Sequence, residues 1–220
     1  MSSNVVGYNK VTLTKGYNML SPMFVNVGGG NKAIVDLFNE DDFTAGESST
    51  EADYISLWYA GGYQDLYFFS TDANNAWSSD GFEETEDDLP ENVGFWLYNR
   101  GGERTVTLSG EVPTEDVTIT LTVGYNLLAN PFSAPLPVSS IVPTQGNTLK
   151  SGESSTEADY ISVWRNGGYD SLYFVSSDAG DTWSEDGFEE TDATIAPGEA
   201  FWLYRRDSAA EIKIPAPYAL

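Results

Sequence analysis

The sequence predicts an all-β protein built from two tandem homologous domains, each a β-sandwich or a partly open β-barrel. Two observations support this prediction. Long stretches of the chain occur twice at a nearly constant spacing, and apolar residues alternate with the period of a strand rather than that of a helix. The 220 residues suffice for two units of roughly a hundred residues each, an ordinary size for a domain.

The repeat is visible without any alignment method. The block GESSTEADYIS at 46–56 recurs unchanged at 152–162, which is 106 positions later. The same spacing relates the aromatic stretch that begins at Trp58 to the one that begins at Trp164. Conservation of both order and spacing indicates that a whole unit was duplicated.

The spacing changes once along the chain. GYNMLSPMF at 16–24 matches GYNLLANPF at 124–132 at a spacing of 108, so two residues were gained or lost downstream of this match. A unit of this length favours two domains over a solenoid of short repeats. We place the boundary so that 1–112 is repeat one and 113–220 is repeat two.

The elements of repeat one and of the boundary follow from local patterns. Ala33–Phe38 allows one helical turn, whereas its counterpart at 138–142 lies between prolines, which disfavour a helix. Ala60-Gly61-Gly62 marks a hairpin turn. Thr105–Leu108 and Val117–Leu121 are β-branched runs that predict strands on either side of the boundary.

The elements of repeat two have clearer signals. Tyr160–Trp164 alternates faces, Asn166-Gly167-Gly168 follows, and the chain resumes with Leu172–Val175. Asn and Gly accept the positive φ of a tight turn, so this segment predicts a hairpin. Phe201–Tyr204 is a further short aromatic strand, entered through a Pro-Gly pair.

The composition limits the expected partners. The chain has 34 acidic and 10 basic residues, a net charge of −24, so nucleic acid and anionic membrane surfaces are not expected partners. No apolar run approaches the roughly 20 residues that cross a bilayer, so membrane insertion is not expected. The start, MSSNVVGYNKVTL, lacks the pattern of a signal peptide. A chain without cysteine nevertheless suits an extracellular or cell-surface location.

Enzymatic activity is not predicted. Cysteine and histidine are absent, which excludes thiolate nucleophiles and histidine-based acid–base catalysis. The sequence has no phosphate-binding Gly-rich loop and no nucleophile elbow. The neighbouring carboxylates Glu189 and Glu190 would point to opposite faces of a strand, so they would not flank one glycosidic bond.

Ser176–Trp183 reads S-x-D-x-G-x-T-W and resembles the Asp-box hairpin known from sialidase propellers. Ser70–Trp77 is a weaker copy. The resemblance implies a structural turn, in which an Asp binds backbone amides, Gly takes a left-handed conformation and Trp packs below. It does not imply sialidase activity. The residues assigned to this turn are Ser176, Asp178, Gly180, Thr182 and Trp183.

Carboxylates cluster in and after each of these turns. Ca²⁺ takes six to eight oxygen ligands, so calcium is the cofactor these clusters suggest. The spacing does not fit an EF-hand, and acidic turns facing water are the alternative interpretation. The candidate calcium ligands are Asp72, Asp80 and Glu84 in repeat one, and Asp178, Asp181, Asp186 and Glu190 in repeat two.

The many aromatic residues allow two interpretations. Exposed Tyr and Trp rings on one face would stack on sugars, whereas buried ones would fill two small cores and the seam between them. We favour the second interpretation, because aromatic residues contribute the largest buried area in small β domains. The residues considered are Tyr59, Tyr63, Tyr67, Trp77, Trp96, Tyr169, Tyr173, Trp183 and Trp202.

The chain ends suggest a way to assemble. The repeat alignment places Ile212 and Ile214 opposite a strand that leads directly into repeat two, and Val5 and Val6 near the segment that enters repeat two. The end of one molecule would then meet the start of the next as repeat one meets repeat two. Such head-to-tail contacts, if they do not close, build a filament.

The module resembles β-rich tandem repeats of secreted and surface proteins of bacteria, on the residues GYNLLANPF, DYISVW, GGY and PGEAFWLY. This resemblance implies a location more than an activity. The first functional prediction is a structural surface protein that joins copies of itself head to tail into a filament or layer. The alternatives are a carbohydrate-binding or adhesin module with glycans as partners, and a structural component of a virion or phage.

Overall fold

The computed structural model describes residues 5–39, 42–59, 61–70, 75–154, 156–176 and 180–218. These residues form six β-sheets, and none of the sheets described closes into a barrel. The predicted all-β class is confirmed, with 49% of residues in strands. The division into two domains stays a prediction. Within the same residues, no helix is long and apolar enough to span a membrane.

The main sheet of repeat one has five antiparallel strands, in the order β2, β8, β4, β5, β6. Tyr54 at the start of β4 stands opposite both Tyr67 and Tyr98, so three tyrosines form a row across this sheet. The strands span Gly16–Leu20 (β2), Phe95–Asn99 (β8), Tyr54–Tyr59 (β4), Gly62–Ser70 (β5) and Asn75–Ser78 (β6).

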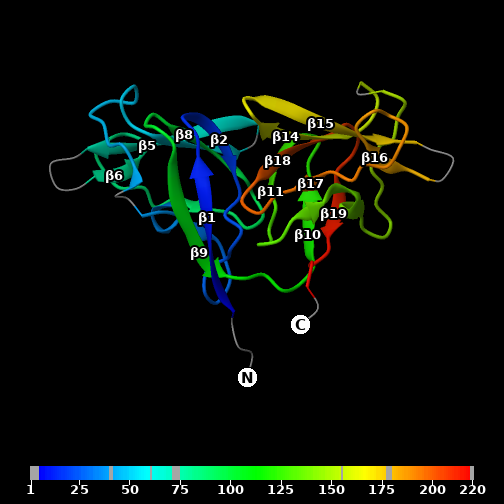
Figure 1. Cartoon of the computed structure of the whole chain (residues 1–220), viewed down its shortest axis with the longest axis horizontal. Helices are drawn as coiled ribbons and strands as arrows, with labels where there is room; N and C mark the ends of the chain where they lie inside the picture. The colour runs from blue at the N-terminus through cyan, green and yellow to red at the C-terminus, as the bar shows by residue number, and fades with distance from the viewer. Residues whose placement is uncertain are drawn as a thin grey trace.

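The main sheet of repeat two has the same order, β11, β18, β14, β15, β16. Tyr160 stands opposite Tyr173 and Tyr204, which repeats the tyrosine row. The two main sheets lie side by side across the upper part of the molecule (Figure 1). The strands span Gly124–Ala129 (β11), Ala200–Arg205 (β18), Tyr160–Arg165 (β14), Gly168–Val175 (β15) and Thr182–Ser184 (β16).

Smaller sheets lie below the main ones in Figure 1. The long strand β1 pairs with β9, and β19 lies between β10 and β13. Two short pairs, β3 with β7 and β12 with β17, complete the sheets. These strands span Val6–Leu13 (β1), Arg104–Glu111 (β9), Val117–Leu121 (β10), Val142–Pro143 (β13), Ala210–Ile214 (β19), Lys32–Ala33 (β3), Asp88–Leu89 (β7), Leu136–Pro137 (β12) and Thr194–Ile195 (β17).

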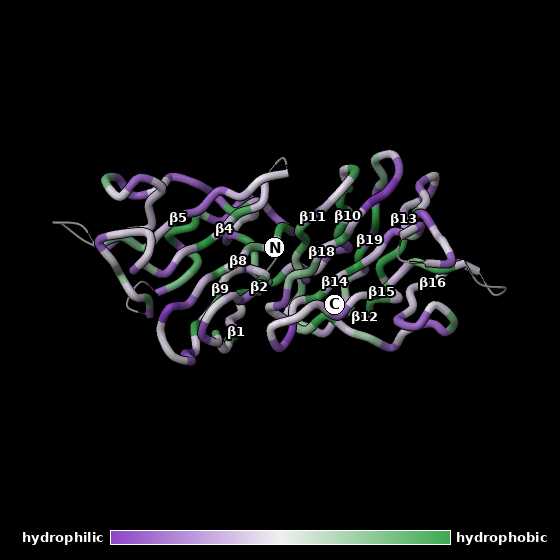
Figure 2. The backbone as a smooth tube through the Cα atoms, turned by 90° about the horizontal axis from the view of Figure 1, so that it is seen from above, coloured by the Kyte–Doolittle hydropathy of each residue, from purple (hydrophilic) through white to green (hydrophobic). Residues whose placement is uncertain are grey.

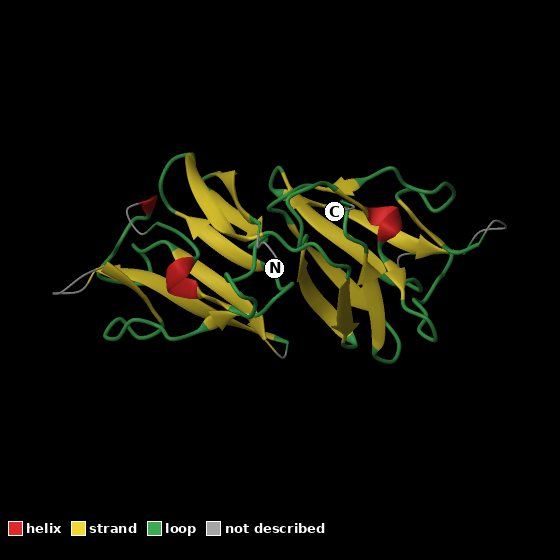
Figure 3. Cartoon of the chain, turned by 90° about the horizontal axis from the view of Figure 1, so that it is seen from below, coloured by secondary structure: helices red, strands yellow, loops and turns green. Residues whose placement is uncertain are grey.

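Each repeat also contains a short 3₁₀ turn, at Ile34–Asp36 and at Val138–Ser140 (Figure 3). The expectation that prolines would prevent the second turn was wrong. Pro137 precedes that turn with φ of −62°, and proline is compatible with the start of a helical turn, where its missing N–H is not needed.

Each repeat packs its own hydrophobic core. One cluster of fully or almost fully buried side chains runs from Leu13 to Leu108, and the other from Leu121 to Ile214. Seen from above, hydrophobic segments follow the strands of both repeats, and many peripheral loops are hydrophilic (Figure 2). Trp77 and Trp183 occupy equivalent positions in the two cores and are 0% and 1% exposed.

The repeats meet through contacts that are reciprocal. The backbone bridge from Leu20 to Glu199 is matched by a bridge from Leu128 to Val93, which are the repeat counterparts of the same two residues. A two-fold relation between the repeats produces this pattern, because each side then uses the same patch. Figure 3 accordingly shows matching elements at opposite ends of the molecule.

Residues close to the two-fold axis approach their own counterparts. A Cβ added at Gly94 would clash with the Cβ of Ala200, the residue that replaces Gly94 in repeat two. Around this point the Ser21 amide donates to the Gly198 carbonyl at 2.8 Å, and the Ala129 amide donates to the Asn92 carbonyl at 3.0 Å. These two bonds are again counterparts, so the joint is self-complementary.

Candidate functional site

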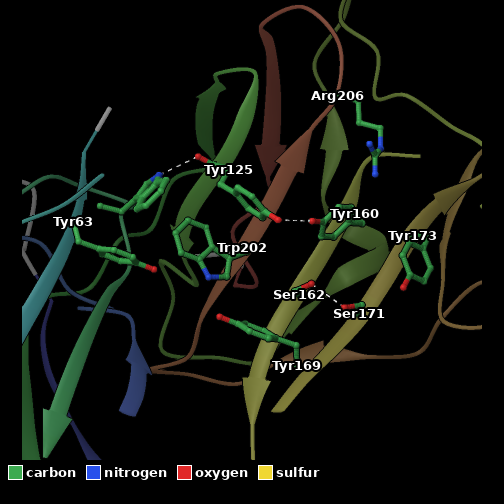
Figure 4. A pocket seen from close by; sticks show the side chains of 10 residues that line it. Tyr63, Tyr125, Tyr160, Ser162, Tyr169, Ser171, Tyr173, Trp202 and Arg206 are labelled. Atoms are coloured by element: carbon green, nitrogen blue, oxygen red, sulfur yellow. Dashed lines mark hydrogen bonds between the residues drawn. The ribbon is translucent and has the colours of Figure 1, made fainter. Parts of the chain in front are cut away.

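The outer face of the main sheets carries a cavity of about 580 Å³ where repeat two meets repeat one (Figure 4). This volume lies within the roughly 300–1,000 Å³ of ligand pockets. We call it the repeat-two pocket. Its lining consists of Tyr125, Tyr160, Ser162, Tyr169, Ser171, Tyr173, Trp202 and Arg206 from repeat two, and Trp58 and Tyr63 from repeat one.

A second cavity, of about 330 Å³, is the counterpart of the first. We call it the repeat-one pocket. Each of its lining residues is the repeat counterpart of a residue that lines the repeat-two pocket, so the two-fold relation of the joint extends to both. Its lining consists of Tyr17, Tyr54, Ser56, Tyr63, Asp65 and Trp96 from repeat one, and Trp164 and Tyr169 from repeat two.

Each pocket is completed by a hairpin from the other repeat. The hairpin β4–β5 extends over repeat two, where the Trp58 indole N–H donates to the Tyr125 carbonyl at 3.2 Å. The hairpin β14–β15 extends over repeat one, where the Trp164 indole N–H donates to the Tyr17 carbonyl at 3.3 Å. Neither pocket is therefore complete within a single repeat.

The local sequence explains why these hairpins reach so far. Asn166 and Gly167 have φ of 52° and 80° at the tip of β14–β15, the positive values that a two-residue turn of the favoured hairpin type requires. In the strands that lead to each tip, alternation places Tyr54, Ser56 and Trp58 on the outer face, while Ile55 and Leu57 enter the core.

The tryptophans form the inner part of both pockets. Trp202 lies edge to face with Trp58 at a ring distance of 5.2 Å, and Trp96 lies edge to face with Trp164 at 5.5 Å. Trp96 and Trp202 are each only 6% exposed. Edge-to-face pairs contribute roughly 0.5–1.5 kcal/mol beyond their buried area, so these rings are firmly held.

Tyrosines form the rim and remain accessible. Tyr63 and Tyr169, which line both pockets, are 55% and 50% exposed. Figure 4 shows Tyr63 entering the repeat-two pocket from repeat one, opposite Tyr169 and Trp202. A half-exposed aromatic ring over a buried aromatic floor offers a flat apolar surface with a polar edge.

Hydroxyl pairs and arginines fix the outer tyrosines. The Tyr54 hydroxyl donates to the Tyr17 hydroxyl at 2.8 Å, and the Tyr125 and Tyr160 hydroxyls are hydrogen-bonded at 3.0 Å. The guanidinium of Arg206 lies 5.0 Å from the centre of the Tyr204 ring, which stacks on Tyr160. Repeat one has the same arrangement. These contacts hold the rings in place before any ligand arrives.

Four tyrosines that line the pockets have a raised pKa. Burial is the main cause that raises the pKa of Tyr63 and of Tyr169. Burial also raises the pKa of Tyr54 and Tyr160, and their hydrogen bonds to Tyr17 and Tyr125 raise it further. At neutral pH these four side chains are therefore uncharged phenols.

The polar groups between the tyrosines differ between the pockets. In the repeat-one pocket the Ser56 hydroxyl donates to the carboxylate of Asp65. In the repeat-two pocket Ser162 and Ser171 share a hydrogen bond of 2.8 Å. Asp65 is the one carboxylate that lines either pocket in the described part of the chain, whereas glycoside hydrolysis ordinarily uses two.

The acidic residues predicted to bind calcium mostly serve their own turns. The Asp80 carboxylate accepts the Phe82 amide at 2.9 Å, and the Asp186 carboxylate accepts the Phe188 amide at 2.9 Å. These backbone donors are the first cause that lowers the pKa of each carboxyl. Asp181 accepts the Ser176 hydroxyl at 2.9 Å.

The remaining candidate ligands are placed as follows. Glu84 and Glu190 are exposed to solvent, and Asp72 and Asp178 lie outside the described residues. Among residues that are described, no three acidic side chains converge as a metal site would require. Calcium binding stays a prediction.

The Asp-box residues stand at the end of the repeat-two core. Trp183 packs against Phe174 with ring centres 5.1 Å apart, and its indole N–H donates to the Ile141 carbonyl at 2.9 Å. Gly180 has φ of 121°, and Thr182 begins β16.

The chain ends are already paired within their own repeats. The Val5 carbonyl accepts the Val112 amide at 2.8 Å, and Val6 pairs with Glu111. Val5 and Val6 are 49% and 62% exposed, whereas Ile212 and Ile214 are both 0% exposed in the repeat-two core. The two isoleucines therefore do not offer side chains to a neighbouring molecule.

The identical blocks each contain a buried aspartate, Asp53 or Asp159, that the sequence analysis did not predict to be important. Asp159 forms an ion pair with Arg205, and both side chains are almost fully buried. Position 99, the counterpart of 205, is Asn in repeat one, and there Arg104 pairs with Asp53 at 3.2 Å instead. In each repeat an arginine thus pairs with the buried aspartate, but Arg104 and Arg205 do not stand at equivalent positions of the two repeats.

Most of the pocket residues were also missed or taken for core. Trp77 and Trp183 are core residues, but Tyr63 and Tyr169 are half exposed and line the pockets. A usable signal was present: the pattern Tyr-x-Ser-x-Trp begins at Tyr54 and again at Tyr160, with apolar residues between. On a strand this pattern places all three polar or aromatic residues on one face.

Comparison of the chain with protein-family models, with curated proteins and with solved structures finds no match.

Proposed function

We propose that the chain is a non-catalytic carbohydrate-binding module of an extracellular or cell-surface protein, and that it holds glycan in the two aromatic pockets. The observation that carries this proposal is the half-exposed tyrosine rim over a buried tryptophan floor, present twice. Sugar rings have apolar C–H faces and hydroxyl edges. Aromatic faces and neutral hydroxyls beside them match both features.

The charge of the molecule favours a ligand without phosphate or sulfate. The net charge of −24 repels polyanions at a distance. The polar groups inside the pockets are mainly hydroxyls, which exchange hydrogen bonds with other hydroxyls in either direction. A neutral glycan satisfies both conditions.

Head-to-tail assembly has weaker support than glycan binding. The joint between the repeats is self-complementary, and contacts of this kind close on themselves instead of propagating. The joint therefore offers no template for a contact between successive molecules. Adhesion to a glycan-coated surface remains compatible with the pockets.

The proposal is tested by binding of the full chain to an array of immobilised neutral and charged glycans. We expect binding to one class of neutral glycan, and a loss of about fivefold or more for Tyr63→Ala or Tyr169→Ala, since a stacking contact is worth about 1 kcal/mol or more. Tyr8→Ala is the matched control, because Tyr8 is 75% exposed and lines neither pocket.

Two results would overturn the proposal. One is the absence of binding to any glycan by the folded chain. The other is binding of proline-rich peptides, a second ligand class that docks in aromatic grooves, in place of glycans.

A further inference from the structure

We propose that the two pockets act as one groove, which binds a single extended, linear glycan across the joint between the repeats. This inference rests on the proposed function and deepens it by naming the form of the ligand. It concerns a chain of several sugar units, as opposed to a single terminal sugar held at each pocket.

The first support is a shared boundary. Tyr63 and Tyr169 each line both cavities, so the same two rings separate and connect them. Both rings are about half exposed, and a ligand that leaves one pocket meets them before it enters the other.

The second support is size. The cavities measure about 580 and 330 Å³, and each alone falls within the roughly 300–1,000 Å³ that ligands of drug size occupy. Several linked sugars would use both cavities.

The third support is the matched lining of the two cavities. The two-fold relation gives both pockets equivalent tyrosine and tryptophan surfaces and one equivalent serine, Ser56 or Ser162, on the same outer face, although Asp65 stands in the repeat-one pocket where the repeat-two pocket has Ser171. A polymer of identical units presents the same chemistry to both. A ligand recognised through one distinctive end would instead be bound separately at each pocket.

The fourth support is a fixed spacing between the pockets. Backbone hydrogen bonds cross the joint at Ser21 to Gly198 and at Gly94 to Leu127, at 2.8 and 3.2 Å. Since the two pockets do not move independently, a chain that fits the first is already positioned for the second. Linked binding of this kind raises affinity without any new type of contact.

The test is isothermal titration calorimetry of the full chain with length series of linear oligosaccharides, from the disaccharide to the octasaccharide. The probes are β-1,4-linked glucose, xylose, mannose and N-acetylglucosamine oligomers. We expect short members of the preferred series to bind two per chain. Longer members should bind one per chain, about a hundredfold more tightly.

Variants in single pockets sharpen the test. Tyr17→Ala affects the repeat-one pocket and Tyr125→Ala the repeat-two pocket, and either one should remove the gain with length while short oligosaccharides still bind the intact pocket. Tyr8→Ala should keep the gain. Thermal unfolding of each variant shows whether its fold is retained.

The failures of the two proposals are distinguishable. If long oligosaccharides bind two per chain with the affinity of short ones, the pockets are independent and the inference of a single groove fails, while the proposed function stands. If no oligosaccharide of any series binds, and the array also shows no glycan binding, both fail.

Discussion

At the scale of single residues, the raised pKa of two pocket phenols bears on the proposed binding of glycan. Burial raises the pKa of Tyr63 and Tyr169, so the folded protein holds these groups uncharged to higher pH than an unfolded chain does. For a group whose pKa is raised on folding, the stabilisation is complete below the unfolded value of about 10 and is lost as pH rises through the folded value.

This shift gives a prediction for binding. Glycan affinity should stay constant from neutral pH to about pH 10, and fall only above it, when the phenols ionise. Calorimetry across this range, with absorbance titration of the phenolates in parallel, measures both events. A decline in affinity well below pH 9 would show that another group controls binding.

The buried ion pairs make a second residue-scale prediction, which concerns stability. Asp159→Asn leaves Arg205 without its anion in the core, and breaking a buried pair costs roughly 3–5 kcal/mol. Asp53→Asn should cost less, because the side chain of its partner Arg104 is 19% exposed to water. Urea unfolding of both variants and the parent gives the two differences. Equal losses would mean that the exposure of the arginine makes no difference. The backbone amides that donate to each aspartate, from Thr44 and Arg100 to Asp53 and from Lys150 and Arg206 to Asp159, would then dominate.

At the scale of elements, the crossing hairpins are the parts that make the pockets. Trp164 on β14 belongs to repeat two but forms a wall of the repeat-one pocket, and Trp58 on β4 does the converse. Each hairpin thus belongs to one repeat and forms a wall of the pocket of the other repeat.

Trp164→Ala should therefore impair the repeat-one pocket and leave the repeat-two pocket working. The number of short oligosaccharides bound per chain should fall from two to one, and Trp58→Ala should give the same number through the other pocket. Trp164→Phe keeps a ring at the site and serves as the control. Loss of both pockets from one substitution, in a chain that remains folded, would contradict the assignment of hairpins to pockets.

The elements also show how far sequence reasoning reached. The predicted strand Val117–Leu121 coincides with β10, and the hairpin around Asn166-Gly167 was found correctly from alternation and turn residues. These features depend on neighbours in the sequence. The pockets do not: the bond from Trp58 to Tyr125 joins residues 67 positions apart in different repeats. Alternation shows that Tyr54, Ser56 and Trp58 share a face, but not that the other repeat covers it.

At the scale of the whole molecule, the sequence did not predict the two-fold symmetry of the joint between the repeats. Two similar halves in one chain are equally compatible with a head-to-tail contact and with a two-fold contact, because both use identical sequences. The reciprocal bridges in the folded molecule, Leu20 to Glu199 and Leu128 to Val93, distinguish the two-fold contact from the head-to-tail one.

The closed joint predicts that the chain is monomeric. Both copies of the self-complementary patch are used within one molecule, and the net charge of −24 opposes close approach of a second. Light scattering after gel filtration at moderate ionic strength should give the mass of a single chain. Filaments or sheets under electron microscopy would contradict this prediction and would favour self-assembly as the function of the chain.

A crystal structure of the full chain with the longest oligosaccharide it binds is the most direct test of the glycan-binding proposal. The predicted result is sugar rings stacked on the tyrosine rim in both pockets, with one continuous chain passing Tyr63 and Tyr169. Sugar bound away from the aromatic face, at the acidic turns or along the smaller sheets, would contradict it.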